Sequence, residues 1–320
     1  MQRHLTALTI ALSLCTTQAL ADTSYPLQLD NCGQTVQLDG PAERIFLVNN
    51  SDIALLSELD ALDRVIARTN EPMPGIYDAE VYDQLENIPL IQTTTNATGG
   101  AVISLESILA AEPDLVLAPE NAVDRQLLAN AGIALYSAPA FCNSSTRAAD
   151  EVANFDWVYQ QLSSFGTLLG EAELAEQRID QLQQEVAALA SDLPEQSPTA
   201  IALYVSRGGK VLSPYGAFSM VTPVFRAAGL NNLYSDEPQR VFDANVEDIL
   251  ALDPDYIVIL HSSTAPQSIV DEFLAIPAVQ GLSAVQNERV TALAFPLTDP
   301  PTPMSIRGAD VLAEQIAKLP

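Results

Sequence analysis

SLESILAAEPDLVLA (Ser104–Ala118) and NVEDILALDPDYIVI (Asn245–Ile259) are two copies of one pattern in a chain of 320 residues. The copies share a glutamate, an Ile-Leu-Ala run and a Pro-Asp pair. Each copy predicts a capped helix that ends at the proline and a buried strand that begins after the aspartate. We therefore expect two lobes built alike, with the matching glutamates Glu106 and Glu247 near the starts of matching helices.

The segment between the two copies, Phe155–Asp192, has a helical pattern and no proline. Its apolar residues recur at the three- and four-residue spacing of one helix face. This spacing predicts one long helix or two abutting helices. A bend is expected at Gly166 or Gly170, because glycine costs about 1 kcal/mol relative to alanine inside a helix. We interpret the segment as one long α-helix that connects the lobes.

Short apolar runs alternate with amphipathic stretches on both sides of this segment. Buried strands are predicted at residues 45–48, 64–67, 88–91, 115–118, 134–136, 200–205, 256–260 and 290–293. A β-hairpin is predicted over Leu27–Leu38, where Asp30–Gly33 is a turn signal. Short strands separated by helices indicate doubly wound parallel sheets. The predicted fold is α/β: two doubly wound parallel-sheet lobes, residues 22–154 and 193–320, joined by one long α-helix over residues 155–192.

Residues 1–21 have the organisation of a secretory signal peptide. A basic start (Arg3) precedes a short apolar run (Leu5–Leu14) and a small-residue cleavage site (Ala19–Ala21). The apolar run is too short to span a bilayer, which takes about twenty residues. Cys15 follows a bulky leucine where a lipid attachment site needs a small residue, so a lipid anchor is not expected. The protein is predicted to be exported.

Two cysteines, Cys32 and Cys142, remain after this cleavage. In an oxidising compartment a single disulfide is the default expectation, with free or metal-bound thiols as the alternative. In the chain-entropy model, a bridge across so long a loop would stabilise the first lobe by about 3–5 kcal/mol.

The chain carries 41 acidic and 14 basic residues, for a formal charge of −27. This charge makes nucleic acid and anionic membrane surfaces poor partners. The acidic residues are dispersed along the chain, as is typical of a solvated surface. Because 48% of the residues are hydrophobic, we expect a folded protein and not a disordered acidic segment.

Catalytic side chains are scarce. His261 is the single histidine after signal cleavage, and the two cysteines are expected to be paired. The chain has no Gly-x-Ser-x-Gly elbow, and Gly208–Lys210 lacks the spacing of a phosphate-binding loop. One imidazole cannot provide the several ligands that a zinc or manganese site needs. We therefore expect neither an enzyme nor a directly bound metal ion, and no cofactor.

In open α/β sheets, ligands bind beyond the carboxyl ends of the strands. The loops predicted to lie there carry the candidate ligand-binding residues Asn50, Arg68, Asn70, Tyr77, Asn96, Arg207, Tyr215, Arg240, Phe242 and His261. Arginine is scarce in so acidic a chain, and its forked donors suit carboxylate or catecholate oxygens. The aromatic residues could supply apolar walls. Ordinary structural interpretations stay open: surface ion pairs for the arginines, core packing for the aromatics, and a hydrogen-bonded turn for His261.

Taken together, these features resemble the substrate-binding proteins of ABC importers for ferric siderophores, haem and cobalamin, which are the class III periplasmic binding proteins. The resemblance covers nearly the whole chain after the signal peptide. It rests on Pro41–Ile45, on both copies of the Glu-x-Ile-Leu-Ala-x-x-Pro-Asp pattern, on the connecting helix and on Ala227–Asn232. It implies a periplasmic receptor that acts as a monomer.

The resemblance also implies roles for particular residues. Glu106 and Glu247 match the glutamates that dock on arginines of the ABC permease dimer, and Cys32 and Cys142 match a cysteine pair found in some members. The ligand would be a small-molecule metal chelate, and the arginines favour a ferric siderophore. Haem or cobalamin is the alternative within the class. A surface adhesion module that uses the same fold without transport is the alternative from a different class.

Overall fold

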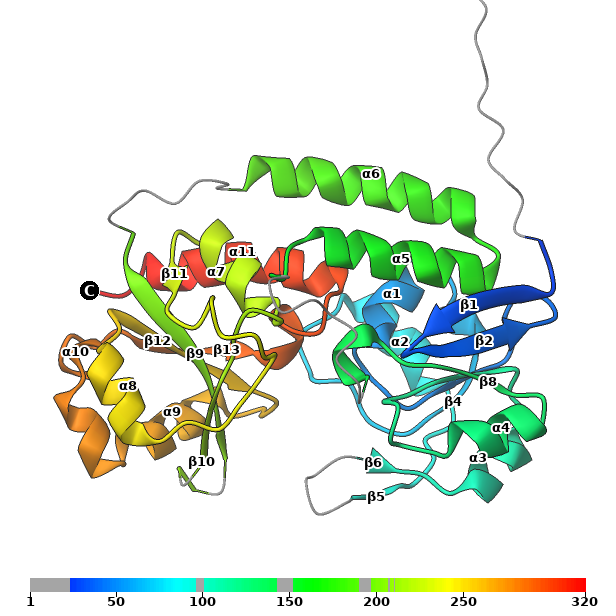
Figure 1. The fold of residues 1–320 in the computed structure, drawn as a ribbon, viewed down its shortest axis with the longest axis horizontal. Helices are drawn as coiled ribbons and strands as arrows, with labels where there is room; N and C mark the ends of the chain where they lie inside the picture. The colour runs from blue at the N-terminus through cyan, green and yellow to red at the C-terminus, as the bar shows by residue number, and fades with distance from the viewer. Residues whose placement is uncertain (1–23, 96–100, 143–151, 190–196, 207, 210) are drawn as a thin grey trace, which may run out of the picture.

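The computed structural model describes residues 24–95, 101–142, 152–189, 197–206, 208–209 and 211–320. Two β-sheets lie side by side, and the helices α5 (Asp156–Leu169) and α6 (Ala172–Ala188) run along one side of the molecule (Figure 1). The predicted α/β class with parallel sheets is confirmed. No helix in these ranges is long and apolar enough to cross a membrane. The predicted signal peptide and Cys15 lie outside the described residues.

The first sheet has the strand order β4-β3-β7-β8, and every neighbouring pair is parallel. Its strands are β3 (Ile45–Leu47), β4 (Val65–Arg68), β7 (Leu115–Leu117) and β8 (Ala134–Tyr136). Its helices are α1 (Asp52–Glu58), α2 (Ala79–Glu86), α3 (Leu105–Ala111) and α4 (Arg125–Asn130). Because α1 and α5 cover one face and α3 and α4 the other, the residues of β3, β7 and β8 are buried and apolar without interruption.

In the second sheet, the parallel strands have the order β11-β9-β12-β13. The strands are β9 (Thr199–Ser206), β11 (Asn231–Asn232), β12 (Tyr256–His261) and β13 (Val290–Ala294). The helices are α7 (Val221–Ala227), α8 (Val246–Leu252), α9 (Pro266–Leu274), α10 (Ser283–Gln286) and α11 (Pro303–Ile316). If the parallel strands of each sheet are numbered 1 to 4 along the chain, their order across the sheet is 2-1-3-4 in both sheets. This shared order agrees with the sequence repeat.

Two details of the sheets differ from the prediction. The second sheet is not wholly parallel, because β10 (Val211–Pro214) pairs antiparallel with the end of β9. The strand predicted at residues 88–91 is reduced to an isolated bridge between Leu90 and Arg68, since Pro89 has no N–H to continue a ladder. The predicted hairpin is present as β1 (Leu27–Asn31) and β2 (Gln34–Leu38), and a second small pair joins β5 (Thr94–Thr95) to β6 (Ala101–Val102).

Both copies of the repeated pattern begin with a side-chain cap. Ser104 Oγ accepts a hydrogen bond from the Ser107 N–H at 3.1 Å, and Asn245 Oδ1 accepts one from the Asp248 N–H at 2.8 Å. These bonds satisfy backbone donors that a helix start otherwise leaves unpaired. Each helix then ends at a residue in the left-handed conformation directly before the proline. The prediction of two capped helices that stop at Pro-Asp is confirmed.

The aspartate that follows each proline holds the start of its sheet's central strand. Asp114 accepts the N–H groups of Glu43 at 2.9 Å and Arg44 at 3.1 Å, just before β3. Asp255 accepts the N–H and the hydroxyl of Thr199, each at 2.8 Å, at the first residue of β9. We call the part of the molecule that contains the first sheet the first half and the part that contains the second sheet the second half. The shared Pro-Asp pair therefore has the same structural purpose in both halves.

The connection between the sheets is helical, as predicted, but it is not one long helix. α5 ends at Gly170, which has a φ of 71°. The Glu171 N–H donates to the Gly166 carbonyl at 2.7 Å and the Gly170 N–H to the Thr167 carbonyl at 3.4 Å, which is a Schellman motif. α6 then folds back along α5 (Figure 1). Because glycine adopts this φ without steric cost, the bend predicted at Gly170 becomes a full reversal of the chain.

Apolar packing joins the two halves. Met220 and Ile306 from the second half lie in the core of the first. Ala54 and Ile76 from the first half lie in a core of the second. Exposing buried apolar surface costs about 25 cal/mol per Å². A wide hinge motion would therefore have to break a shared core.

Gly166→Ala should destabilise the protein. A Cβ at Gly166 would lie 2.5 Å from the Cβ of Ala175 on α6, which is closer than such atoms approach. In an open helix interior the same change would stabilise by about 1 kcal/mol, so the sign of the change reports the contact between α5 and α6. Thermal unfolding followed by circular dichroism measures it. Gly166→Ala combined with Ala175→Gly should recover much of the loss, whereas a more stable single variant would show that the helices are not closely packed.

Candidate functional site

Each sheet contains two neighbouring strands whose following connections run to opposite sides of the sheet. These strands are β3 and β7 in the first sheet and β9 and β12 in the second. Ligands of open α/β proteins bind at the carboxyl ends of the strands at this point. We therefore define the candidate site as the loops that follow these strands and the residues that contact them.

In the first half, the loop after β3 and the first residue of α1 carry buried polar atoms without partners among the described residues. Asn49 Nδ2, Asn50 Oδ1 and Asp52 Oδ1 have no hydrogen-bond partner among the described residues. Tyr77 lies beside them, and its hydroxyl donates to the Asn50 carbonyl at 3.1 Å. Buried polar atoms are almost always paired with protein, water or ligand. The loop is therefore suited to a polar group that the described residues do not supply.

Burial also sets the protonation of two side chains near this loop. Asp52 is 2% exposed, and desolvation raises the pKa of its carboxyl to about 7. Desolvation, followed by the nearby Tyr82 and Asp52, raises the pKa of Tyr77 above its ordinary value. Tyr77 therefore keeps its proton and acts as a donor, while Asp52 titrates near neutral pH.

In the second half, β12 ends at His261. This residue lines a cavity of about 210 Å³ together with Tyr204, Val205, Leu260, Ser262, Ser263 and Ile269. The His261 Nδ1 lies 3.0 Å from the Ser263 carbonyl oxygen and 3.3 Å from its nitrogen. Desolvation lowers the pKa of the imidazole, so the ring is neutral at pH 7. A cavity of this volume is too small for a whole siderophore.

Arg240 is the candidate arginine best placed to meet a ligand. Its Nε donates to Asp299 Oδ2 at 2.5 Å, and its guanidinium carbon lies 5.2 Å from the ring centroid of Phe141 and 5.9 Å from that of Phe295. Phe141 belongs to the first half and Phe295 to the second, so Arg240 lies where the halves meet. Among the described residues, only its Nε has a hydrogen-bond partner. Within the described ranges, Nη1 and Nη2 have no protein acceptor.

Arg68 and Asn70 are engaged by the protein itself. Arg68 is 4% exposed and donates to the carbonyls of Leu85 at 3.1 Å and Asn70 at 3.0 Å and to the Glu71 carboxylate at 2.7 Å. Asn70 Nδ2 donates to the Val48 carbonyl at 3.1 Å. These bonds hold the loop after β4 in place and leave few donors for a ligand. A ligand-binding role for either residue stays a prediction.

The aromatic candidates of the second half, Tyr215 and Phe242, each pack against another aromatic ring. Tyr215 is 4% exposed, and its ring centroid lies 6.3 Å from that of Phe295. Phe242 packs edge to face on Tyr234 at 5.2 Å. Desolvation raises the pKa of Tyr215, although the charge of Arg240 lowers it in part. Among these aromatic side chains, Phe295, together with Phe141 of the first half, lies over the guanidinium of Arg240.

Sequence reasoning missed Asp299, Phe141 and Phe295. All three follow predicted strands, 134–136 or 290–293, so a search of every strand end would have included them. Asn96 and Arg207, which the sequence suggested, lie outside the described residues.

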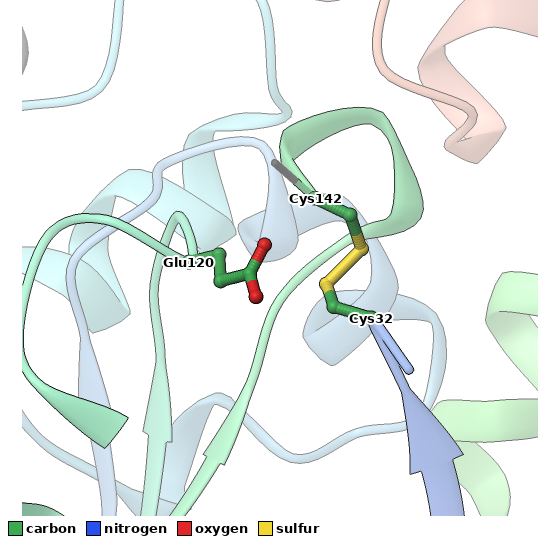
Figure 2. Close-up of side chains that lie close together, drawn as sticks. All are labelled: Cys32, Glu120 and Cys142. Carbon is green, nitrogen blue, oxygen red and sulfur yellow. A yellow bond between two sulfur atoms is a disulfide. The ribbon is translucent and has the colours of Figure 1, made fainter. Parts of the chain in front are cut away.

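The predicted disulfide between Cys32 and Cys142 is present, with a Cα–Cα distance of 5.2 Å (Figure 2). It joins the turn of the β1–β2 hairpin to the segment after β8. The Glu120 side chain extends toward it, and the three potential ligand atoms lie within 4.8 Å of one another. Because both sulfur atoms are bonded to each other, neither is available as the thiolate that a metal needs.

Glu106 and Glu247 occupy equivalent places. Each lies in the first turn of its helix, α3 or α8, and each is exposed. Neither is paired with a basic side chain within the described ranges. A carboxylate in a first turn is favoured by the helix dipole, so these positions by themselves are compatible with a purely local role.

The chain matches the model of the periplasmic binding protein family over residues 47–297, and it belongs to that family. A similar solved structure comes from an ABC-type Fe³⁺-hydroxamate transport system of Saccharomonospora viridis, with a TM-score of 0.83 and 35% identity, covering 91% of this chain and 99% of that one. The heme-binding protein HutB of Vibrio cholerae has a TM-score of 0.65 and 14% identity, over 86% of this chain and 99% of that one. The vitamin B12-binding protein BtuF of the same organism has a TM-score of 0.58 and 19% identity, over 87% and 97%.

Among curated proteins, a cobalamin-binding protein of Halobacterium salinarum is 24% identical over 242 residues, which are 73% of this chain and 58% of that relative. This chain thus spans less than two thirds of the relative's length. Together, the matches place the protein among the class III substrate-binding proteins of ABC importers. The members of this class are binding proteins of the periplasm, and their ligands include siderophores, haem and cobalamin.

Asp52→Asn should flatten the pH dependence of stability. The folded-state pKa of about 7 lies above the ordinary value of 3.8, so between these values the folded state binds more protons than the unfolded state. Stability therefore falls as the pH rises from about 4 to about 7 and is lowest above that range. Asparagine stays neutral, so the free energy of unfolding at pH 8 should rise by about 2–4 kcal/mol, with little change at pH 4.

Urea titrations at the two pH values measure this difference, and the exposed Asp63→Asn is the matched control. An equal effect of Asp52→Asn at pH 4 and pH 8 would mean that the carboxyl is not held in its neutral form.

Proposed function

We propose that this protein binds a ferric siderophore between two lobes, residues 22–154 and 193–320, and delivers it to an ABC importer. The observation that carries this proposal is the Arg240 guanidinium, which lies where the halves meet with its outer nitrogens unpaired among the described residues. The likeness to a protein from an Fe³⁺-hydroxamate transport system at 35% identity supports it. We further propose that residues 1–21 are removed on export and that the receptor is a monomer without enzymatic activity.

The charge of the site favours a chelate of low net charge. Arg240 is already paired with the buried Asp299, so the pair is formally neutral, and the whole chain carries −27. A ferric catecholate is strongly anionic and would be repelled by such a protein. In a ferric hydroxamate, the hydroxamate charges balance the ferric ion. The arginines alone suggested a ligand with carboxylate or catecholate oxygens. Because Arg240 is paired with Asp299, we instead favour a hydroxamate siderophore as the ligand.

Recognition would then depend on directed hydrogen bonds within apolar walls. The Nη groups of Arg240 can donate to two chelate oxygens at once. Phe141, Phe295 and Tyr215 exclude water around them, and hydrogen bonds are stronger in such surroundings.

Cobalamin is the second candidate, because the curated relative that spans most of this chain carries that description. Haem has less support. The His261 Nδ1 lies within hydrogen-bond distance of Ser263, and the ring lines a cavity of only about 210 Å³.

We propose that Glu106 and Glu247 dock the receptor on the permease. Both are exposed at the starts of equivalent helices, one in each half. Two carboxylates at a fixed separation give a two-point contact that sets orientation and depends on salt.

Arg240→Ala should weaken binding of a ferric hydroxamate by about 10- to 100-fold, the range for hydrogen bonds from a charged donor. Isothermal titration with a ferric hydroxamate, a ferric catecholate, cobalamin and haem measures it. Arg289→Ala is the matched control, because Arg289 also lies over an aromatic ring, Tyr256 at 5.3 Å, at the opposite end of the sheet. Wild-type binding of cobalamin alone would replace the siderophore proposal with the second candidate.

Glu106→Lys combined with Glu247→Lys should abolish ligand uptake through the cognate permease while ligand affinity stays within about twofold, because a reversed charge repels a basic partner. Uptake into proteoliposomes and titration of the free receptor measure the two effects. Glu173→Lys with Glu176→Lys on α6 makes the same change of charge at exposed positions and should leave uptake intact. A loss of affinity in the first variant would move these glutamates into the binding site.

A further inference from the structure

Asp299 holds Arg240 from within the second half. It lies in the segment Thr298–Pro303, every residue of which is buried. Its carboxylate also accepts the Met220 N–H at 3.4 Å. A buried carboxylate on a buried segment cannot follow a moving partner, and leaving it unpaired would be costly. In this ion pair, Asp299 therefore fixes the position of the Arg240 guanidinium, and Arg240 does not fix the position of Asp299.

Phe141 holds the same guanidinium from the first half. It is the last residue of a short 3₁₀ turn and directly precedes Cys142. Its carbonyl accepts the Glu120 N–H at 3.4 Å, from the loop after β7. The disulfide to Cys32 then ties this turn to the β1–β2 hairpin (Figure 2).

The hairpin is itself anchored to the sheet by Asn31, which is 4% exposed. Its Nδ2 donates to the Ser137 carbonyl at 2.8 Å, and its Oδ1 accepts the Ser137 N–H at 2.9 Å. Arg125 donates to the Asn31 carbonyl at 3.1 Å and to its Oδ1 at 2.9 Å. The disulfide thus fastens Phe141 to a fixed element at the carboxyl end of β8.

We propose that the Cys32–Cys142 disulfide and Asp299 are positioning groups for ligand recognition. Through Phe141 and through the ion pair, they hold Arg240 between the halves with its Nη donors turned to the ligand. This inference rests on the proposed function, in which a ferric chelate meets Arg240. The disulfide then has a second role beside stabilising the fold: it sets the ligand affinity of the folded receptor.

The test is a double-variant cycle on ligand affinity. Cys32→Ser with Cys142→Ser should weaken binding of a ferric hydroxamate by about 3- to 30-fold, the range expected for losing one cation–aromatic contact. In the Arg240→Ala background, the same serine pair should change affinity by less than about twofold, because the group that the disulfide positions is gone. Circular dichroism fixes a temperature at which every variant is folded.

Phe141→Leu tests the same link with the disulfide intact. It should weaken binding about as much as the serine pair, and Phe141→Tyr, which keeps the ring, should restore most of the affinity. Asp299→Asn keeps the shape of the partner of Arg240 but removes its charge. It should weaken ligand binding when Arg240 is present and change ligand affinity little in the Arg240→Ala background. Equal losses with and without Arg240 would overturn the proposal, as would unchanged affinity in the serine pair.

A measurement without ligand separates this inference from the proposed function. In ¹⁵N-arginine-labelled protein, the Nε–H signal of Arg240, assigned through Arg240→Lys, should be shifted and protected from solvent exchange. In the serine pair and in Phe141→Leu, it should lose the part of its shift that comes from the Phe141 ring, while the bond to Asp299 remains. If the wild type bound none of the chelates, the proposed function would fail while this signal still reported the positioning. An Arg240 signal that does not change in either variant would overturn the inference alone.

Discussion

Each half of the molecule depends on one aspartate that accepts hydrogen bonds from the backbone where the central strand of its sheet begins. Asp114 does this for β3 and Asp255 for β9. Two bonds from fixed donors to one carboxylate set the position of the helix–strand unit against the strand beside it. The loops at the opposite end of each sheet take their positions from that arrangement, and so does the candidate site. Glu106 and Glu247 lie in the first turns of α3 and α8, the helices that precede Asp114 and Asp255. Their positions therefore depend on the same arrangement.

The two halves share apolar packing, and this restricts how the receptor can respond to a ligand. Met220 and Ile306 are buried in the core of the first half, and α6 packs back on α5 instead of bridging the halves as a lone rod. A rotation that separated the halves would expose this surface, at about 25 cal/mol per Å². Ligand entry is therefore expected to involve side chains and loops around Arg240 more than a wide hinge. The separation of Glu106 and Glu247 would then change little between the ligand-bound and ligand-free states.

The fold could be predicted where local signals were complete, and it could not be predicted where the outcome depends on contacts made only after folding. Uninterrupted apolar runs located most of the buried strands. The connection could not be settled in this way, because the same apolar spacing suits one long helix or two packed helices, and Gly170 decides between them. At the site, the scarcity of arginine in this chain made Arg240 and Arg68 equally strong candidates. Arg68 is engaged by protein acceptors, whereas the partners of Arg240 are Asp299, which is 59 residues away, and Phe141 in the other half.

The two proposed contacts of this receptor differ in physical kind. At physiological salt, the Debye length is about 8 Å, so the dispersed acidic charge acts close to the surface. There it opposes anionic chelates and favours a basic permease, and both effects are screened as salt rises. Inside the proposed site, Asp299 already balances the charge of Arg240, so recognition there would depend on the direction of hydrogen bonds among apolar rings and much less on salt. The same acidic protein can therefore select a chelate by geometry and its membrane partner by charge.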